Sequence, residues 1–158
     1  TFNMAGLHSS CTIFPNAEYK KIQEDTLRQA WLMSPNCMAN SAIEACYTYG
    51  DEWVDEQNAY LTENAEFVTS YLKEHAPQIK PVKPEGTYLM WLDCSELSMT
   101  SEEIVKILAS EYKMAVGGGA GYQGNGEYFL RFNIGCPRET LEKGMEILAR
   151  FVADKKGV

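Results

Sequence analysis

The sequence predicts a mixed α+β fold in which helices cover one face of a small sheet. From about residue 77 onward the patterns follow the order strand, strand, helix, glycine-rich loop, strand, helix. A long amphipathic helix over residues 51–76 precedes that run. The N-terminal third contains only one strand-like run, too few to close a core of its own. This order of elements favours an α+β sandwich.

The N-terminal third is expected to contain a strand and two helices. Residues 8–14, HSSCTIF, have the composition of a short buried strand. Residues 17–32 have helical spacing, and the break at residues 34–36, SPN, ends that helix. A second helix is expected to start near Asn40 or Ser41, because Ser41 and Glu44 have the spacing of a capping box.

The long helix is bounded by Gly50, which ends the helix before it, and by Pro77. Apolar and aromatic residues recur at spacings of three, four and seven, which predicts one buried stripe. The stripe consists of Trp53, Tyr60, Leu61, Asn64, Phe67, Val68, Tyr71 and Leu72.

Two strands are expected after this helix. Residues 79–83 predict an edge strand, because Pro81 cannot donate a ladder hydrogen bond. Residues 87–93, TYLMWLD, are apolar on both faces, which indicates a strand covered on both sides or one side of a tight interface.

The last third begins with a capping box, in which Thr100 precedes Glu103 and an apolar helical face. Residues 114–126 form a glycine-rich loop, and residues 127–134, EYFLRFNI, predict a strand. Pro137 then suits the first turn of a final helix. The inner face of that helix is expected to consist of Leu141, Met145, Leu148 and Val152.

The charge, the apolar runs and the cysteines of the sequence limit what the protein can bind. The 158 residues carry a net charge of −8 and a pI near 4.8, which argues against binding to nucleic-acid phosphates. No apolar run approaches the ~20 residues needed to cross a bilayer. The cysteines lack the spacing of a zinc site, and their scattered, odd-numbered set indicates free thiols in a reducing cytosol. They are Cys11, Cys37, Cys46, Cys94 and Cys136.

The glycine-rich loop contains a literal G-x-G-x-x-G from Gly119 to Gly124. A dinucleotide site needs this motif between a strand and a helix N-terminus, and here a strand follows instead. The interpretations that remain are a loop bordering a site and a plain connection. His8 and His75 are far apart in the sequence and show no metal-ligand spacing, so no metal is expected.

Arg131 is the strongest candidate for a binding residue. It lies inside the apolar strand YFLRFNI, where a cation without a counter-charge would be costly. Its planar guanidinium suits a carboxylate held by two parallel bonds. The sequence leaves two partners open: a substrate carboxylate, or an Asp or Glu of the protein itself.

Several long stretches occur together in one order. They are TFNMAGL at residues 1–7, SPN at 34–36, AIEACYTYGDEWVDEQNAYLTENAEFV at 42–68, KPVKPEGTYLMWLD at 80–93 and GNGEYFLRFNIGCPRETLEKGMEIL at 124–148. Together they resemble the class I/II aminotransferase family of pyridoxal-phosphate (PLP) enzymes. The resemblance is to the carbon–sulfur lyase branch, typified by cystathionine β-lyases, and covers nearly all of residues 1–155.

The resemblance implies an α/β fold, the C-terminal part of the PLP-dependent transferase fold. Residues 1–55 would be the end of the large parallel-sheet domain. Residues 56–158 would be the linking helix and a small α+β domain. The resemblance also implies a cytoplasmic homodimer with active sites at the subunit interface.

The family motif S-x-x-K-T-F-N-x-A-G-L implies that the PLP-bearing lysine stands immediately before Thr1. No catalytic residue is therefore expected in this chain, and most contacts to PLP would lie upstream. In the family, an arginine at the place of Arg131 binds the α-carboxylate of the substrate, and Asn133 would support it. Many aminotransferases carry an arginine for the cofactor phosphate where this chain has His8, a departure that favours the lyase branch.

The expected activity is a PLP-dependent β-elimination. It would act on cystathionine or related S-substituted cysteines and give a thiol, pyruvate and ammonia. Two alternatives stay open. One is a PLP-dependent aminotransferase, which would pass its amino group to a keto acid. The other is a stand-alone α+β module that binds a small molecule and is not an enzyme.

Overall fold

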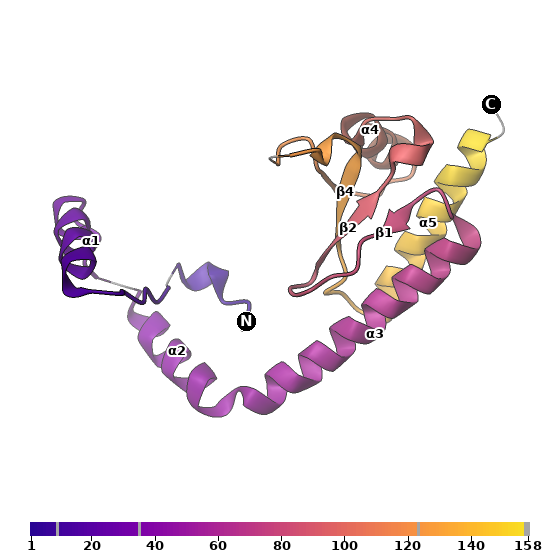
Figure 1. The fold of residues 1–158 in the computed structure, drawn as a ribbon. Helices are drawn as coiled ribbons and strands as arrows, with labels where there is room; N and C mark the ends of the chain where they lie inside the picture. The colour runs from indigo at the N-terminus through magenta and orange to yellow at the C-terminus, as the bar shows by residue number, and fades with distance from the viewer. Residues whose placement is uncertain (9, 35, 123, 157–158) are drawn as a thin grey trace. The chain divides into compact units, whose positions relative to one another are not determined.

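The computed structural model describes residues 1–8, 10–34, 36–122 and 124–156 (Figure 1). Its contacts divide the chain into two compact units, Thr1–Glu56 (unit 1) and Gln57–Val158 (unit 2). Unit 1 holds η1 (Ala5–Leu7), α1 (Ala17–Gln29), α2 (Cys37–Tyr49) and the start of α3 (Asp51–His75). Unit 2 holds the rest of α3, then β1 (Lys80–Pro81), β2 (Leu89–Asp93), η2 (Ser95–Leu97), α4 (Ser101–Glu111), β3 (Gly117–Gly118), η3 (Gly126–Tyr128), β4 (Phe129–Asn133) and α5 (Arg138–Lys156).

The strand expected at residues 8–14 is wrong. No strand occurs in the described residues of unit 1, and Ile13 is 95% exposed. A strand needs a neighbour to pair with its backbone, and no described segment of unit 1 supplies one. Residue 9, in the middle of the expected strand, lies outside the described residues.

The helix expected near Ser41 begins earlier, at Cys37. The side chain of Asn36 accepts a hydrogen bond from the backbone N–H of Met38 at 2.9 Å, so Asn36 caps the helix. Ser41 and Glu44 therefore lie inside α2, and the capping box expected there does not form. The predicted end at Gly50 is confirmed, because its N–H donates to the carbonyl of Cys46 at 2.8 Å.

The long helix is confirmed as α3, but only part of its stripe is buried. Asn64, Val68 and Leu72 are buried, whereas Trp53 and Tyr60 are 47% and 39% exposed.

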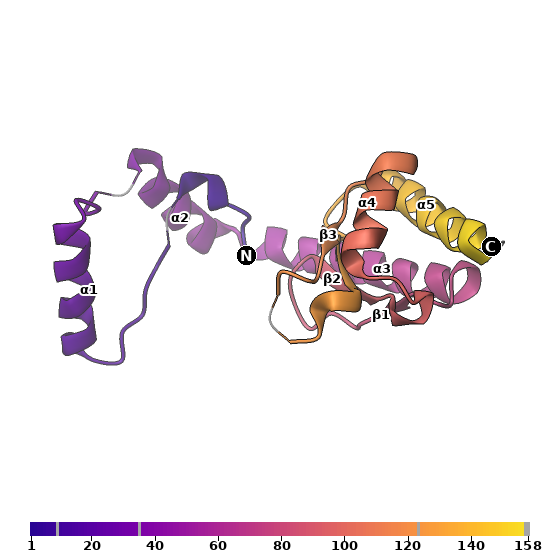
Figure 2. The same ribbon diagram turned by 90° about the horizontal axis from the view of Figure 1, so that it is seen from above.

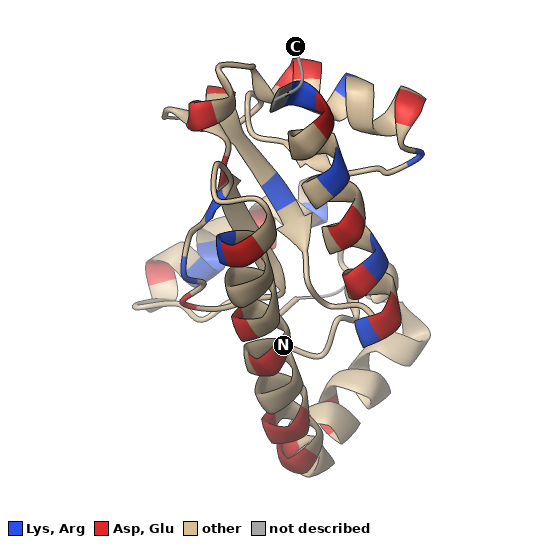
Figure 3. Ribbon diagram, turned by 90° about the vertical axis from the view of Figure 1, so that its right-hand side faces the viewer, with Lys and Arg blue, Asp and Glu red and all other residues tan. Residues whose placement is uncertain are grey.

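Acidic residues recur along α3, while acidic and basic residues alternate along α5 (Figure 3).

Unit 2 is built on a four-stranded antiparallel sheet in the order β1-β2-β4-β3 (Figures 1 and 2). The edge position expected for residues 79–83 is confirmed, since β1 pairs only with β2. The strands expected at 87–93 and 127–134 are confirmed as β2 and β4. Arg131 is paired with Trp91 on one side and with Gly117 on the other.

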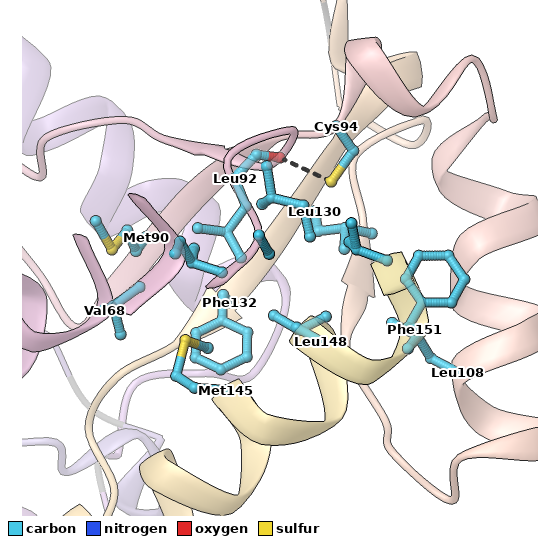
Figure 4. Close-up of a cluster of buried hydrophobic side chains, with 14 of the residues drawn as sticks. Val68, Met90, Leu92, Cys94, Leu108, Leu130, Phe132, Met145, Leu148 and Phe151 are labelled. Carbon is cyan, nitrogen blue, oxygen red and sulfur yellow. Dashed lines mark hydrogen bonds between the residues drawn. The ribbon is translucent and has the colours of Figure 1, made fainter. Parts of the chain in front are cut away.

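The core of unit 2 lies between one face of this sheet and the helices α3, α4 and α5 (Figure 4). Every second residue of β2 and β4 points into it, as the two-residue period of a strand requires. The buried strand residues are Met90, Leu92, Leu130 and Phe132, and the final helix contributes Leu141, Met145, Leu148, Phe151 and Val152. The four inner-face residues expected for the final helix are all buried.

The opposite face of the sheet is formed by the alternate residues of β2 and β4. We call it the open face; its members are Leu89, Trp91, Asp93, Phe129, Arg131 and Asn133. All of them are half-buried except Asn133, which is exposed. The sheet is thus covered by helices of unit 2 on one face only.

Local hydrogen bonds set the ends of several elements. The capping box at α4 is confirmed: the Thr100 backbone N–H donates to a Glu103 carboxylate oxygen at 2.8 Å, and the Glu103 N–H donates to the Thr100 hydroxyl at 3.3 Å. Asn64 of α3 is fully buried, and its amide donates to the carbonyl of Ile134 at 2.8 Å. Asn64 thereby joins α3 to the end of β4.

Candidate functional site

Arg131 lies at the centre of the open face. Its neighbours on β4, Leu130 and Phe132, point into the core, so Arg131 points to the other side. The flanking strands present Trp91 and Gly117 beside it. The sheet therefore holds a half-buried cation between an aromatic residue and a residue without a side chain.

Arg131 forms no ion pair with any carboxylate in the described part of the chain. The alternative that an Asp or Glu of this chain neutralises it therefore has no support among these residues. A partly desolvated guanidinium without a counter-charge is an unfavourable arrangement. An acidic ligand that reaches the open face would relieve it.

The ring of Tyr122 packs against this cation. The Cζ atom of Arg131 lies over the Tyr122 ring, 5.2 Å from its centroid. Trp91 meets the same ring edge-on, with centroids 5.2 Å apart and an interplanar angle of 84°. Trp91 in turn packs edge-on against Phe129 at 6.4 Å. Aromatic side chains thus surround one side of the guanidinium.

The glycine-rich loop that carries Tyr122 is not a dinucleotide site. A dinucleotide motif leads directly into a helix, whereas this loop contains the short strand β3 and is followed by η3 and β4. The N-terminus of α4 contacts the loop, but the Ser101 hydroxyl there accepts a hydrogen bond from the Ala120 N–H at 3.3 Å. The loop expected over 114–126 thus includes the two-residue strand β3 and the first residue of η3. A Cβ on Gly119 would lie 2.7 Å from the carbonyl oxygen of Phe129 and closer still to that of Gly126, so glycine permits a close backbone approach there.

The other candidate residues do not contact Arg131: Asn133 lies at the edge of the open face, and His8 and His75 lie outside it. Asn133 accepts a hydrogen bond from the Gly135 N–H at 2.8 Å and so shapes the turn after β4. His8 is exposed and has a left-handed backbone, with φ 49°. His75 is the last residue of α3 and packs against Tyr71, with ring centroids 4.4 Å apart.

Two thiols of unit 2 are poor nucleophiles. Burial raises the pKa of the Cys94 thiol to about 12, and its Sγ lies 3.7 Å from the carbonyl oxygen of Leu92 (Figure 4). Burial also raises the pKa of Cys136. Both side chains stay protonated near neutral pH, so neither supplies a thiolate.

A groove of about 760 Å³ lies elsewhere in unit 2. It runs between one side of α3 and the connection from β1 to β2, and Ile134 closes one end. Its lining is mixed, with Leu61 and Ala65 beside Glu66 and Lys83. Arg131 and Tyr122 do not line it, so the groove and the open face are separate surfaces.

The described part of the chain offers neither a membrane span nor a metal cluster. No helix there is long and apolar enough to span a bilayer. No three or more His, Cys, Asp or Glu side chains gather there in a way that could hold a metal ion.

Comparison with known proteins places this arrangement in a family. The sequence profile "Aminotransferase class I and II" matches residues 1–148. The chain belongs to the class I and II aminotransferase family. The resemblance to this family in the sequence motifs is thereby confirmed.

Curated relatives narrow the similarity to one branch. The chain is 34% identical over 145 residues to cystathionine beta-lyase PatB of Bacillus subtilis, covering 92% of this chain and 38% of that protein. It is 32% identical over 146 residues to protein MalY of Escherichia coli, covering 92% of this chain and 37% of that protein. The chain therefore spans under two-fifths of the length of these relatives.

Solved structures agree on the fold. A PLP-bound putative aminotransferase from Clostridium difficile superposes with a TM-score of 0.92 at 35% identity, covering 96% of this chain and 39% of the other. The PLP-bound C-S lyase of Staphylococcus hominis superposes with a TM-score of 0.83 at 27% identity, with the same coverage. The chain thus has the fold of the C-terminal part of these PLP enzymes.

The sequence identified Arg131 but missed its surroundings. Trp91 was assigned only to an apolar strand, and Tyr122 only to a glycine-rich loop. The register of β2 on β4 brings Trp91 beside Arg131. The glycine-rich loop places Tyr122 in contact with both residues. The alternation of β4 alone placed Arg131 opposite the core, but no sequence signal gave the register.

Proposed function

We propose that this chain belongs to a PLP-dependent carbon–sulfur β-lyase. The enzyme would convert cystathionine or a related S-substituted cysteine, with water, into a thiol, pyruvate and ammonia. The named relatives PatB and the Staphylococcus hominis lyase support the reaction class. The observation that carries the assignment of the site is the half-buried Arg131, which has no acidic partner in the described part of the chain.

The described residues fit the substrate side of such a site. Arg131 offers a planar fork of N–H donors that matches a carboxylate. For PLP itself, the position that binds the cofactor phosphate in many aminotransferases is occupied here by His8, and His8 is exposed. We propose that the PLP lysine and most cofactor contacts lie outside this chain, as the family motif before Thr1 implies.

In this mechanism the role of the chain is to orient the substrate. Bound PLP supplies an electron sink for the carbanion chemistry. Arg131 binds the α-carboxylate through two parallel hydrogen bonds and so limits rotation of the amino acid. This restraint fixes the direction of the Cα–H bond that a base must break, which lowers the entropic part of the barrier. The core packing of Leu130 and Phe132 holds the strand that presents the guanidinium.

Replacement of Arg131 tests the assignment. Arg131→Lys keeps the charge and loses the fork, and we expect kcat/KM for cystathionine to fall about 30-fold or more, equivalent to about 2–5 kcal/mol. The assay measures pyruvate in the PLP-loaded full-length enzyme without any keto acid. Arg150→Lys is the matched control, because Arg150 also lies over a tyrosine ring, that of Tyr112, at 5.1 Å. An unchanged kcat/KM in Arg131→Lys would refute the assignment.

An aminotransferase is the second candidate, favoured by the 35% identity to a putative aminotransferase. Such an enzyme would require a keto acid as amino acceptor. The two candidates separate in one assay: a lyase releases pyruvate from cystathionine without an acceptor, and an aminotransferase does not.

We further propose that the enzyme is a cytoplasmic homodimer. Unit 1 exposes large apolar side chains, among them Ile13 at 95% and Trp31 at 93% exposure, and the rest of the full-length protein together with a second subunit would bury them. The five cysteines are all unpaired, which suits a reducing compartment. Sedimentation analysis of the full-length protein tests the oligomeric state.

A further inference from the structure

The side chain of Arg131 is long and flexible, yet its guanidinium must meet a carboxylate in one orientation. An arginine side chain loses rotamer entropy when it is fixed. If that loss fell at the moment of binding, it would weaken the affinity for the substrate. The residues around Arg131 therefore matter as much as the cation itself.

Three neighbours shape the space around this side chain before any ligand arrives. Trp91 stands beside it on β2. Gly117 stands on β3, where a Cβ would lie 3.5 Å from Arg131 Nε, so a longer side chain would displace the guanidinium. Tyr122 places its ring under the cation at 5.2 Å. Strand pairing fixes the first two neighbours, whereas Tyr122 reaches the site from a loop.

We propose that Tyr122 is a positioning residue for Arg131, holding the guanidinium on the open face ready for the substrate carboxylate. A ring face attracts the cation through its quadrupole and does not use up the in-plane N–H donors. The donors stay available for the two parallel bonds to a carboxylate. Trp91 supports the ring by its edge-on contact at 5.2 Å. This inference rests on the proposed role of Arg131 in substrate binding.

The ring and not the hydroxyl of Tyr122 is what this arrangement requires. No hydrogen bond from the Tyr122 side chain is found among the described residues, and its recorded side-chain contacts are with Arg131 and Trp91. Tyr122→Phe keeps the ring and should preserve function. Tyr122→Leu keeps an apolar side chain and removes the ring.

The test measures binding and turnover in the PLP-loaded full-length enzyme. L-Alanine, which has a carboxylate and no leaving group, and its amide are titrated by calorimetry. We expect Tyr122→Leu to weaken L-alanine about fivefold, as for a partly exposed cation–π contact, and to leave the amide unchanged. With cystathionine, KM should rise by a similar factor while kcat changes less than twofold. Tyr122→Phe should match the wild type in every measurement.

Tyr128→Leu is the matched control, because Tyr128 follows the same loop and is 39% exposed against 43% for Tyr122. We expect wild-type affinities from it. Wild-type affinity for L-alanine in Tyr122→Leu, or equal weakening of acid and amide, would overturn the inference. If the amide of L-alanine binds too weakly to measure, the affinities of Tyr122→Phe and Tyr122→Leu for L-alanine are compared instead. Equal affinities of these two variants would then overturn the inference.

Arg131→Lys, run in parallel, separates the two proposals. If it weakens L-alanine while Tyr122→Leu does not, the role of Tyr122 is wrong and that of Arg131 stands. If it leaves L-alanine unaffected, the assignment of the carboxylate site itself fails.

Discussion

The two units follow the same local rules and differ in burial. In unit 1, α1 and α2 are capped by Asn16 and Asn36, and pairs such as Lys21 with Asp25 support the helix surface. Yet among the described residues of unit 1, Ala39 is the only buried hydrophobic residue. Unit 2 contains a contiguous core drawn from three helices and two strands. Local signals are thus sufficient to place helices in both units, whereas strands appear only where a core and pairing partners are present.

The largest expected effect comes from the core of unit 2. Leu130→Ala removes a fully buried side chain and should lower the free energy of unfolding by about 2–5 kcal/mol. The counterpart in unit 1 is Ile22→Ala, where the side chain is 56% exposed and the change should stay within about 0.5 kcal/mol. Urea unfolding of the 158-residue chain, followed by circular dichroism, compares them. Equal losses from both variants would contradict the contrast between the units.

A smaller effect is expected from the link between α3 and β4. Asn64→Ala removes the donor to the carbonyl of Ile134 and leaves that buried carbonyl without its partner. The expected loss is about 1–3 kcal/mol of unfolding free energy, measured by the same urea titration. Asn58→Ala on the same helix is the control, since Asn58 is exposed. If the two variants unfold at the same urea concentration, the buried hydrogen bond does not contribute.

The smallest effect compares helix caps across the units. Thr100→Ala should cost about 1 kcal/mol in global stability, because α4 packs into the core through Ile104 and Leu108. Asn16→Ala should reduce the helicity of α1 with little effect on the main unfolding transition, because no residue of α1 is buried. A matching shift of the main transition in both variants would show that the units unfold together.

The same cap gives a pH dependence. Hydrogen bonds from the Thr100 backbone and hydroxyl lower the pKa of Glu103 below its usual value. A carboxyl whose pKa is lower in the folded state stabilises the fold above its unfolded pKa. This stabilisation is lost as the pH falls through the folded pKa. Thr100→Ala removes the hydroxyl donor, so its acid-induced loss of stability should be smaller than that of the wild type.

Much of the fold of unit 2 was predictable from local sequence. Pro77 and the period of the long helix gave α3, the Thr100 capping box gave the start of α4, and the alternation in YFLRFNI gave β4. These features depend on neighbours within a few residues. The strand predicted at 8–14 failed because strand formation depends on distant pairing, which composition does not encode.

The candidate site was predictable only in part. A cation within an apolar strand is a local signal, so Arg131 was found. The contact with Tyr122 depends on the register of two strand pairs and on the course of a loop between them. The register of a strand pair depends on the packing of all the side chains on one face of the sheet, so no single residue predicts it.

The bond between Asn64 and Ile134 has a mechanical consequence. Ile134 follows Arg131 by three residues, so the strand that presents the cation is fastened to α3, the one helix shared by both units. Two further contacts hold the same segment: the Tyr60 hydroxyl donates to the Cys136 carbonyl at 3.1 Å, and the Asn64 amide lies 3.4 Å from it. The backbone just beyond the cation is therefore anchored by side chains of α3 as well as by the packed core.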